Sequence, residues 1–325
     1  MNKRTRILAG ALAVLLLIVL IVYLAPRLAG TPQQAAPTAT PVPPTATPVP
    51  PTPTPAPVQV TDDLGKALTL PKPPQRIISL APSVTEILFA IGAGDKVVGV
   101  QDFSNYPPEA ASLPKIGGFP LNYELIASLQ PDLCIGADIT SPDDIAKLEG
   151  LGLKVMIINR TDLEGIFTNI ELVGKAVGME QSANALAASL RAELQALQDR
   201  LKAATTKPRV FVELDETLYT VGPGSFIHPL VELAGGANIA ADANNPYPQL
   251  SAEQVIAKDP EVIILTDAAY GVTPEQVKAR AGWDQITAVK TGAVYPIDGD
   301  IISRPGPRIL EGLKALAALI HPELK

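Results

Sequence analysis

The sequence predicts an α/β protein made of two lobes that a single long helix joins. Three observations support this class. Short apolar runs rich in β-branched residues alternate with helical patterns on both sides of residue 180, which is typical of βαβ units with a mainly parallel sheet. Residues 185–202 are rich in strong helix formers and contain no Gly or Pro, which favours one long helix. Finally, a 15-residue stretch of the first half recurs in the second half without a gap.

The predicted N-terminal lobe covers residues 58–178 and begins with a strand at 76–80. We expect Ser83 to cap the helix that follows, with Glu86 three residues later completing a capping box and Gly92 ending the helix. Asn122 is expected to cap a further helix that ends at Leu129. The other elements expected in this lobe are strands at 96–100, 132–136 and 154–158 and a helix at 143–150.

A connecting helix is predicted within residues 179–206, and Pro208 closes it. Strands and helices alternate again in the predicted C-terminal lobe, residues 207–325. Strands are expected at 209–214, 262–266 and 293–297, and helices at 225–234, 251–258, 274–280 and 307–320. Because one helix offers less hinge freedom than two or three flexible crossovers, we expect little relative motion of the lobes.

The internal repeat pairs residues 121–135 with residues 250–264. Each copy begins with an N-cap residue, carries a glutamate two positions later, and continues with Pro, an acidic residue and an apolar strand. Glu124 and Glu253 therefore occupy equivalent first helical turns. One interpretation is that each carboxylate only complements its helix dipole. The other is a matched pair of exposed acids, one on each lobe, that docks on a two-fold partner with basic pockets.

The N-terminal segment, residues 1–30, is directed to a membrane. An uncharged apolar run at 7–25 follows three basic residues and is long enough to span a bilayer as a helix. An uncleaved anchor is therefore predicted, with a cleaved secretory signal as the alternative. Residues 31–57 contain 11 prolines, seven threonines and no charge, so we expect a polyproline-like stalk or linker. This topology would put the remaining residues outside the cytoplasm.

Composition excludes several classes of function. The first 57 residues hold four basic and no acidic residues, so the remaining 268 carry 22 basic and 33 acidic residues, a net charge of −11. This balance argues against a nucleic-acid binder. One cysteine, Cys134, and two histidines, His228 and His321, leave no basis for a disulfide framework or a resident metal centre. We find no nucleophile elbow, zinc-protease motif or P-loop, so no catalytic residues are predicted and the protein is not expected to be an enzyme.

The outer part of the chain resembles the substrate-binding proteins of ABC importers that serve cobalamin, haem and ferric siderophores. The matching stretches, in order, are VTDDLG (60–65), RIISLAPSVTE (76–86), NYPP (105–108), NYE (122–124) with PD (131–132), GGANI (235–239), PYPQ (246–249) and PRI (307–309). The resemblance implies two Rossmann-like α/β lobes bridged by one backbone helix, with the ligand in the cleft between them. It also implies that Glu124 and Glu253 engage arginines of a permease dimer driven by cytoplasmic ATPase subunits.

The ligand implied by the resemblance is a corrinoid, cobalamin, carried as cargo with no cofactor. On the cobalamin-binding pattern the ligand-binding residues are Phe103, Phe119, Tyr247, Asp300 and Arg304. Aromatic residues make up only 4% of the chain, and large planar ligands gain from aromatic stacking. Haem or a ferric siderophore therefore stays open as the ligand. A stalked extracellular adhesion module is a more distant alternative, because it gives no reason for the duplicated glutamate-bearing helices.

Overall fold

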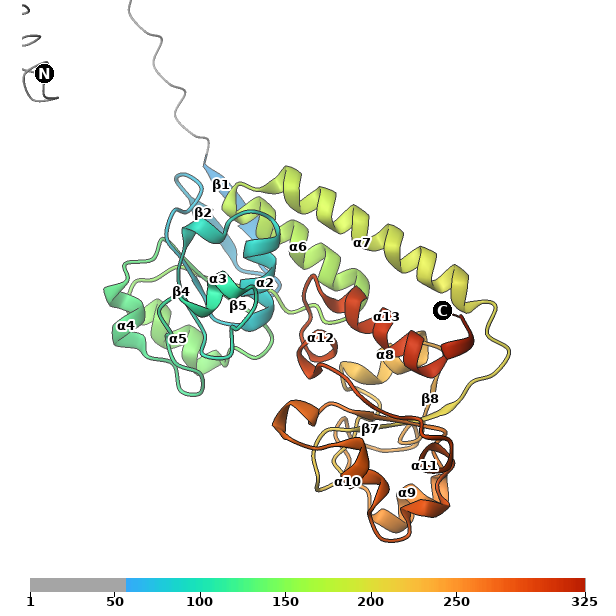
Figure 1. Ribbon diagram of the computed structural model, residues 1–325. Helices are drawn as coiled ribbons and strands as arrows, with labels where there is room; N and C mark the ends of the chain where they lie inside the picture. Colours follow the sequence, from blue (N-terminus) through green and yellow to red (C-terminus); the bar gives the residue numbers. More distant parts are fainter. Residues whose placement is uncertain (1–56, 325) are drawn as a thin grey trace, which may run out of the picture. The chain divides into compact units, whose positions relative to one another are not determined.

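The computed structural model describes residues 57–324. Two separate four-stranded sheets confirm the prediction of two α/β lobes. We call the part around the first sheet the N-terminal lobe and the part around the second the C-terminal lobe (Figure 1). Residues 54–325 form one compact unit, and the described residues supply both sheets with hydrophobic cores. This unit therefore carries its own core and can be studied by itself.

The N-terminal lobe is built on a parallel sheet with strand order β4-β3-β5-β6. Its central strands are buried along their whole length, as expected when helices cover both faces of a parallel sheet. An antiparallel hairpin precedes the sheet. The elements are β1 (Val58–Thr61), β2 (Ala67–Leu70), β3 (Ile77–Ser79), α2 (Pro82–Ala90), η2 (Gly94–Lys96), β4 (Val97–Val100), α3 (Pro108–Ala111), α4 (Tyr123–Ser128), β5 (Leu133–Gly136), α5 (Pro142–Gly150), β6 (Val155–Ile157) and α6 (Leu163–Val177).

The C-terminal lobe has a second parallel sheet with strand order β10-β9-β7-β8. All seven strands and helices predicted for this lobe are present within two residues of their expected ends, and one short strand and five short helices are additional. The elements are β7 (Arg209–Glu213), α8 (Ile227–Leu233), β8 (Ala237–Asn238), α9 (Ala252–Lys258), β9 (Val262–Leu265), η3 (Ala268–Tyr270), α10 (Pro274–Lys278), η4 (Trp283–Gln285), α11 (Thr287–Thr291), β10 (Val294–Pro296), α12 (Gly299–Ser303), α13 (Ile309–Ile320) and η5 (Pro322–Leu324).

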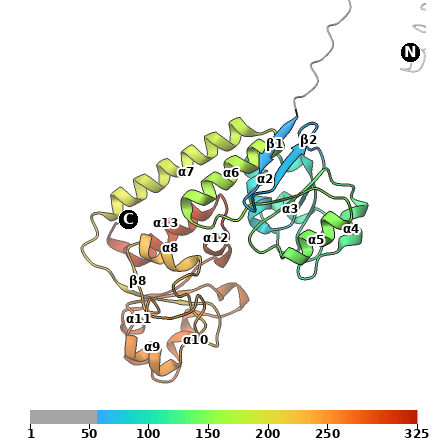
Figure 2. The ribbon, with the colours of Figure 1, turned by 180° about the vertical axis from the view of Figure 1, so that it is seen from behind.

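The long connecting helix is α7 (Glu180–Leu201). It packs along α6 of the N-terminal lobe and against α13 of the C-terminal lobe, as both ribbon views show (Figures 1 and 2). One hydrophobic cluster runs from the β1–β2 hairpin through α6 and α7 to α13. The long helix predicted within residues 179–206 is present as α7. Helices α6 and α13 pack against it, and α6 lies in a stretch to which the sequence analysis assigned no element.

The internal repeat has a structural basis in strand and helix ends. Asn122 accepts a hydrogen bond from the amide of Leu125 at 3.0 Å, and Ser251 forms the equivalent cap on α9 together with Gln254. The acidic residue after the repeated proline binds the start of the neighbouring strand of the sheet in each lobe, β3 or β7. Asp132 accepts from the Arg76 amide at 3.0 Å, and Glu261 accepts from the Arg209 amide at 3.0 Å.

Candidate functional site

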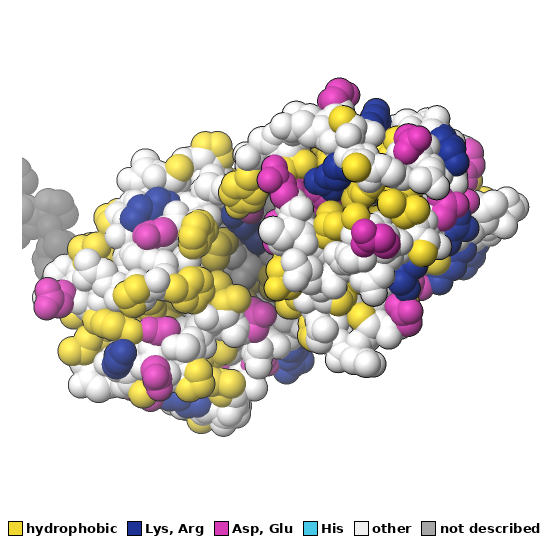
Figure 3. Space-filling model, turned by 90° about the horizontal axis from the view of Figure 1, so that it is seen from below, with side chains coloured by type: hydrophobic (Ala, Val, Ile, Leu, Met, Phe, Trp, Pro, Cys, Tyr) yellow, Lys and Arg dark blue, Asp and Glu magenta, His cyan; other side chains and the backbone are white. Residues whose placement is uncertain are grey.

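Two adjoining cavities lie between the lobes. One has a volume of about 460 Å³ and the other about 220 Å³, and Pro82 and Arg304 line both. Each cavity takes residues from the N-terminal lobe and from the C-terminal lobe. We call the two together the cleft. In the view from below, the cleft appears as a groove between the lobes with hydrophobic side chains on both walls (Figure 3).

The direction of the strands in the two sheets explains where the cleft lies. In the N-terminal lobe, Asp102 follows β4 and Asp138 follows β5; in the C-terminal lobe, Thr266 follows β9 and Asp298 follows β10. All four line the cleft. Because ligands of open α/β sheets bind outside the carboxyl ends of the strands, both lobes present their ligand-binding edges to the same space.

Four of the five predicted ligand residues lie in the cleft. Phe103, Asp300 and Arg304 line the larger cavity, and Tyr247 lines the smaller one together with Arg304. Phe103 is 63% exposed and Tyr247 53% exposed, so both rings are available to stack on a planar ligand. Phe119 lines neither cavity. It is 68% exposed on a loop whose Gly118 lies beside the ring of Phe103.

Two further aromatic residues line the cleft that the sequence reasoning did not select. Tyr270 borders the larger cavity and Phe226 the smaller one. Tyr270 is 90% exposed. It is the last residue of η3, which follows strand β9 shortly afterwards in the sequence. Its position just after a predicted buried strand was the available signal, because such positions are where α/β proteins carry binding residues.

The prediction of a capping box at Ser83 and Glu86 is wrong. Helix α2 begins with Pro82, its N-cap is Ala81, and no side chain caps it. Glu86 is buried, with 3% of its surface exposed, because it turns toward two arginines of the C-terminal lobe. Its carboxylate accepts from Arg304 Nη1 at 3.0 Å and from Arg308 Nε at 2.9 Å and Nη2 at 2.7 Å.

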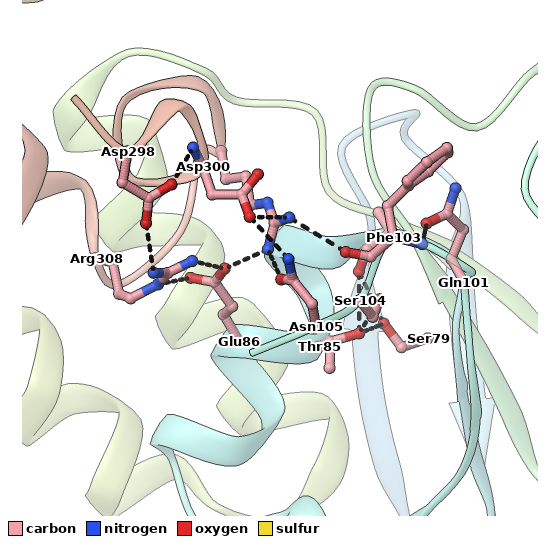
Figure 4. A network of polar contacts seen from close by, with 12 residues as sticks. Ser79, Thr85, Glu86, Gln101, Phe103, Ser104, Asn105, Asp298, Asp300 and Arg308 are labelled. Atoms are coloured by element: carbon pink, nitrogen blue, oxygen red, sulfur yellow. Dashed lines mark hydrogen bonds and ion pairs between the residues drawn. The ribbon is translucent and has the colours of Figure 1, made fainter. Parts of the chain in front are cut away.

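Figure 4 shows how this contact continues into the cleft. Arg304 also binds Asp300 at 2.6 Å, and it donates to Asn105 Oδ1 at 2.8 Å and to the carbonyl of Phe103 at 3.1 Å. Asn105 in turn donates to Asp300 at 3.0 Å. With 11% of its side chain exposed, Arg304 is held by both lobes and is not a freely solvated surface residue.

The formal charges of the cleft are mostly negative. Four carboxylates line it, those of Asp102, Asp138, Asp298 and Asp300, against the single guanidinium of Arg304. Arg308 is held on Glu86, and Arg160 pairs with Asp63 at 2.9 Å; neither lines the cleft.

The two histidines and the cysteine do not line the cleft. His228 bonds Asn238 at 2.8 Å, and His321 lies 2.9 Å from Glu323. Cys134 is buried in β5, and its burial raises the pKa of the thiol to about 12. Within residues 57–324, no cluster of three or more His, Cys, Asp or Glu side chains has the geometry to hold a metal ion.

Glu124 and Glu253, the predicted docking pair, are both exposed in the first turns of α4 and α9. A hydrogen bond with the side chain of Ser251 lowers the pKa of Glu253, so this group is charged at neutral pH. Helices α4 and α9 both lie on the side of their lobe away from α7 (Figures 1 and 2).

The predicted membrane anchor at 1–30 and nearly all of the predicted stalk at 31–57 lie outside the described residues. Among the helices of residues 57–324, none has the length and apolar character needed to cross a bilayer.

Two α/β lobes, a packed helical bridge and a ligand-sized cleft between carboxyl edges define a bilobal solute-binding protein. Comparison with known proteins agrees with this class. The family model "Periplasmic binding protein" matches residues 77–301, and the chain belongs to this family, among the substrate-binding proteins of ABC importers for cobalamin, haem and siderophores. Such proteins are transport components, and this chain is not an enzyme.

Relatives of several kinds are similar over most of the chain. An uncharacterized ABC transporter substrate-binding lipoprotein of Bacillus subtilis is 35% identical over 274 residues, 82% of this chain and 86% of its own length. The vitamin B12-binding protein of Vibrio cholerae is 35% identical over 257 residues, 78% of this chain and 91% of its own.

Solved structures are similar to the same extent. The crystal structure of the periplasmic vitamin B12-binding protein of Vibrio cholerae has a TM-score of 0.67 at 33% identity and covers 78% of this chain and 99% of its own. The periplasmic haem-binding protein of Roseiflexus sp. RS-1 has a TM-score of 0.70 at 30% identity and covers 77% and 99%.

Proposed function

We propose that this protein captures a corrinoid, cobalamin, in the cleft and delivers it to the permease of an ABC importer. The single observation that carries the choice of ligand is the charge of the cleft, where four carboxylates face one arginine. The corrin ring carries peripheral amide groups, and carboxylates are strong acceptors for amide N–H donors. The vitamin B12-binding proteins among the relatives support the same choice.

Haem and anionic siderophores fit this charge pattern less well. A haem carries two propionate carboxylates, which would meet the side chains of Asp138, Asp298 and Asp300 at unfavourable like charge. Haem is nevertheless the second candidate, because Tyr247 and Tyr270 line the cleft and tyrosine is a known iron ligand. The similarity to a haem-binding protein of Roseiflexus supports keeping it.

We propose that Phe103 and Tyr247 stack on the ligand, that Asp300 accepts amide hydrogen bonds, and that Arg304 donates to the ligand. Phe119 would contribute only if its loop contacts a ligand that protrudes from the cleft. Delivery would use Glu124 and Glu253 as docking residues for a permease dimer with cytoplasmic ATPase subunits. Residues 1–30 would anchor the protein in the cell membrane through the apolar run 7–25, with the binding lobes outside the cytoplasm.

Calorimetric titration of residues 54–325 with cyanocobalamin, haemin and a ferric hydroxamate siderophore tests the ligand. We expect tight binding of cyanocobalamin, weakened about tenfold by Arg304→Ala because a charged hydrogen bond is lost, and several-fold by Tyr247→Ala. Arg200→Ala is the matched control, since Arg200 is exposed at the end of α7. Unchanged affinity in both cleft variants, or binding of the siderophore alone, would contradict the assignment.

The docking residues are tested by transport. Reversing both charges, Glu124→Lys with Glu253→Lys, should abolish uptake and leave ligand affinity unchanged, because neither residue lines the cleft. Glu275→Lys is the matched control, since Glu275 is an exposed acid in the first turn of α10. Normal uptake by the double variant would show that the docking assignment is wrong.

A further inference from the structure

Glu86 of the N-terminal lobe binds two arginines of the C-terminal lobe, Arg304 and Arg308. Its carboxylate is nearly inaccessible to solvent and receives three hydrogen bonds from two arginines more than 200 residues away in sequence. Burial of a charge is costly unless the charge is paired and hydrogen-bonded. Glu86 is therefore the buried counter-charge that the two arginines share, beside the more exposed Asp300 at Arg304 and Asp298 at Arg308.

The two arginines differ in what else they face. Arg304 lines both cavities of the cleft. Arg308 lines neither, and its guanidinium stacks on the ring of Tyr106, 4.0 Å from the ring centroid. Bonding to Glu86 raises the pKa of Arg308, so Arg308 keeps its positive charge behind the cleft. Without Glu86, the positive charges of Arg304 and Arg308 would have no buried counter-ion.

We propose that Glu86 is a specificity-determining residue that acts through Arg304. It holds the guanidinium in place from the opposite lobe, and it limits the net charge of the Glu86–Arg304–Arg308 group to +1. The acidic cleft wall then selects a neutral, amide-bearing metal chelate over an anionic one. This inference rests on the proposed function, but it concerns a residue outside the predicted ligand set.

Charge-changing variants separate this role from a merely structural one. Glu86→Gln raises the formal charge of the group to +2, Arg308→Gln lowers it to 0, and the double variant returns it to +1. Glu86→Gln should shift the ratio of haemin to cyanocobalamin affinity toward haemin, roughly three- to tenfold, because the ligand's two negative charges meet one more positive charge. Arg308→Gln should shift the ratio the opposite way, and the double variant should restore it.

The affinities are measured by calorimetry on residues 54–325, with Arg200→Gln as a surface-charge control. If Glu86→Gln does not fold, the affinity ratios of Arg308→Gln and the double variant still test the proposal, because these two variants differ by one charge. An affinity ratio that is the same in all variants would refute this inference and leave the proposed function standing. A double variant that keeps the shifted ratio of a single variant would do the same. If the unmodified protein binds neither haemin nor cyanocobalamin, the proposed function fails and the inference fails with it.

Discussion

Asp267 is a buried carboxyl group of the C-terminal lobe. It is 3% exposed, and neither of its oxygens has a hydrogen-bond partner among residues 57–324. Arg280, the nearby cation, is already committed, since both of its Nη atoms bind Glu213 at 2.6 Å. Burial in the first place, and the charge of Glu213 in the second, raise the pKa of Asp267 from 3.8 to about 6.

This raised pKa has a definite consequence for stability. A carboxyl group whose pKa is higher in the folded state favours folding at low pH, and that contribution is lost as pH rises through the folded pKa. A shift from 3.8 to about 6 corresponds to a cost of about 3 kcal/mol above pH 7 and roughly half of that at pH 5. Asp267→Asn removes the ionisation, so it should stabilise the protein by about 1–3 kcal/mol at pH 8, less whatever burial of the amide costs.

Denaturant unfolding of residues 54–325 between pH 5 and pH 8 measures the effect. Trp283 is the only tryptophan in the chain and is buried in the C-terminal lobe, so its fluorescence follows the lobe that contains Asp267. The stability gained by Asp267→Asn should rise by about 1–2 kcal/mol from pH 5 to pH 8. Asp284→Asn, at an exposed position beside the tryptophan, is the control and should show no such rise. A gain that does not change with pH would refute the reasoning.

Three further outcomes are expected. Arg280→Met leaves Glu213, which is fully buried, without a counter-charge, and should cost about 3–5 kcal/mol in denaturant unfolding; a loss below about 1 kcal/mol would contradict this. Gly174→Ala would put a Cβ 2.1 Å from that of Ala183, so the contact of α6 with α7 must open and the melting temperature should fall; an unchanged melting temperature would argue against this close packing. Cys134 should resist a thiol reagent at pH 8 in the folded protein and react after unfolding, because its thiol pKa is raised to about 12; rapid native labelling would contradict the buried position.

The features that the sequence predicted well are those encoded locally. Strands β5 and β9 were predicted from short runs of consecutive apolar residues, and every residue of both strands is buried. The caps at Asn122 and Ser251 depend on residues three positions away. The internal repeat extends further than we recognised. Arg76 Nε donates to the carbonyl of Leu129 at 3.0 Å, and Arg209 Nε donates to the equivalent carbonyl of Lys258 at 3.2 Å. In each lobe, an arginine at the start of the neighbouring strand therefore binds the C-terminal end of the repeated helix.

Features that depend on distant contacts were not predicted. Helix α6 contains Gly165 and Gly174 together with several β-branched residues, which weakens its intrinsic helix propensity. The packing of α6 on α7 compensates for this, and at Gly174 only a glycine fits beside Ala183. Glu86 likewise has the spacing of a capping residue, and only the folded chain brings it to Arg308, 222 residues away.

The contacts at Glu86 also bear on how the cleft can change. Two sets of contacts join the lobes. The packed helices α6, α7 and α13 form one set, and the ion pairs of Glu86 with Arg304 and Arg308 form the other. A hinge needs a few residues that absorb a large backbone change, and a continuous hydrophobic layer is a poor place for one. On the proposed function, a ligand would exchange for the outer contacts of Arg304, those with Asn105 and Asp300, while the buried contact with Glu86 would stay intact. Binding would then need a local rearrangement at the cleft surface. Release would need a force, applied by another protein, that separates Glu86 from Arg304 and Arg308.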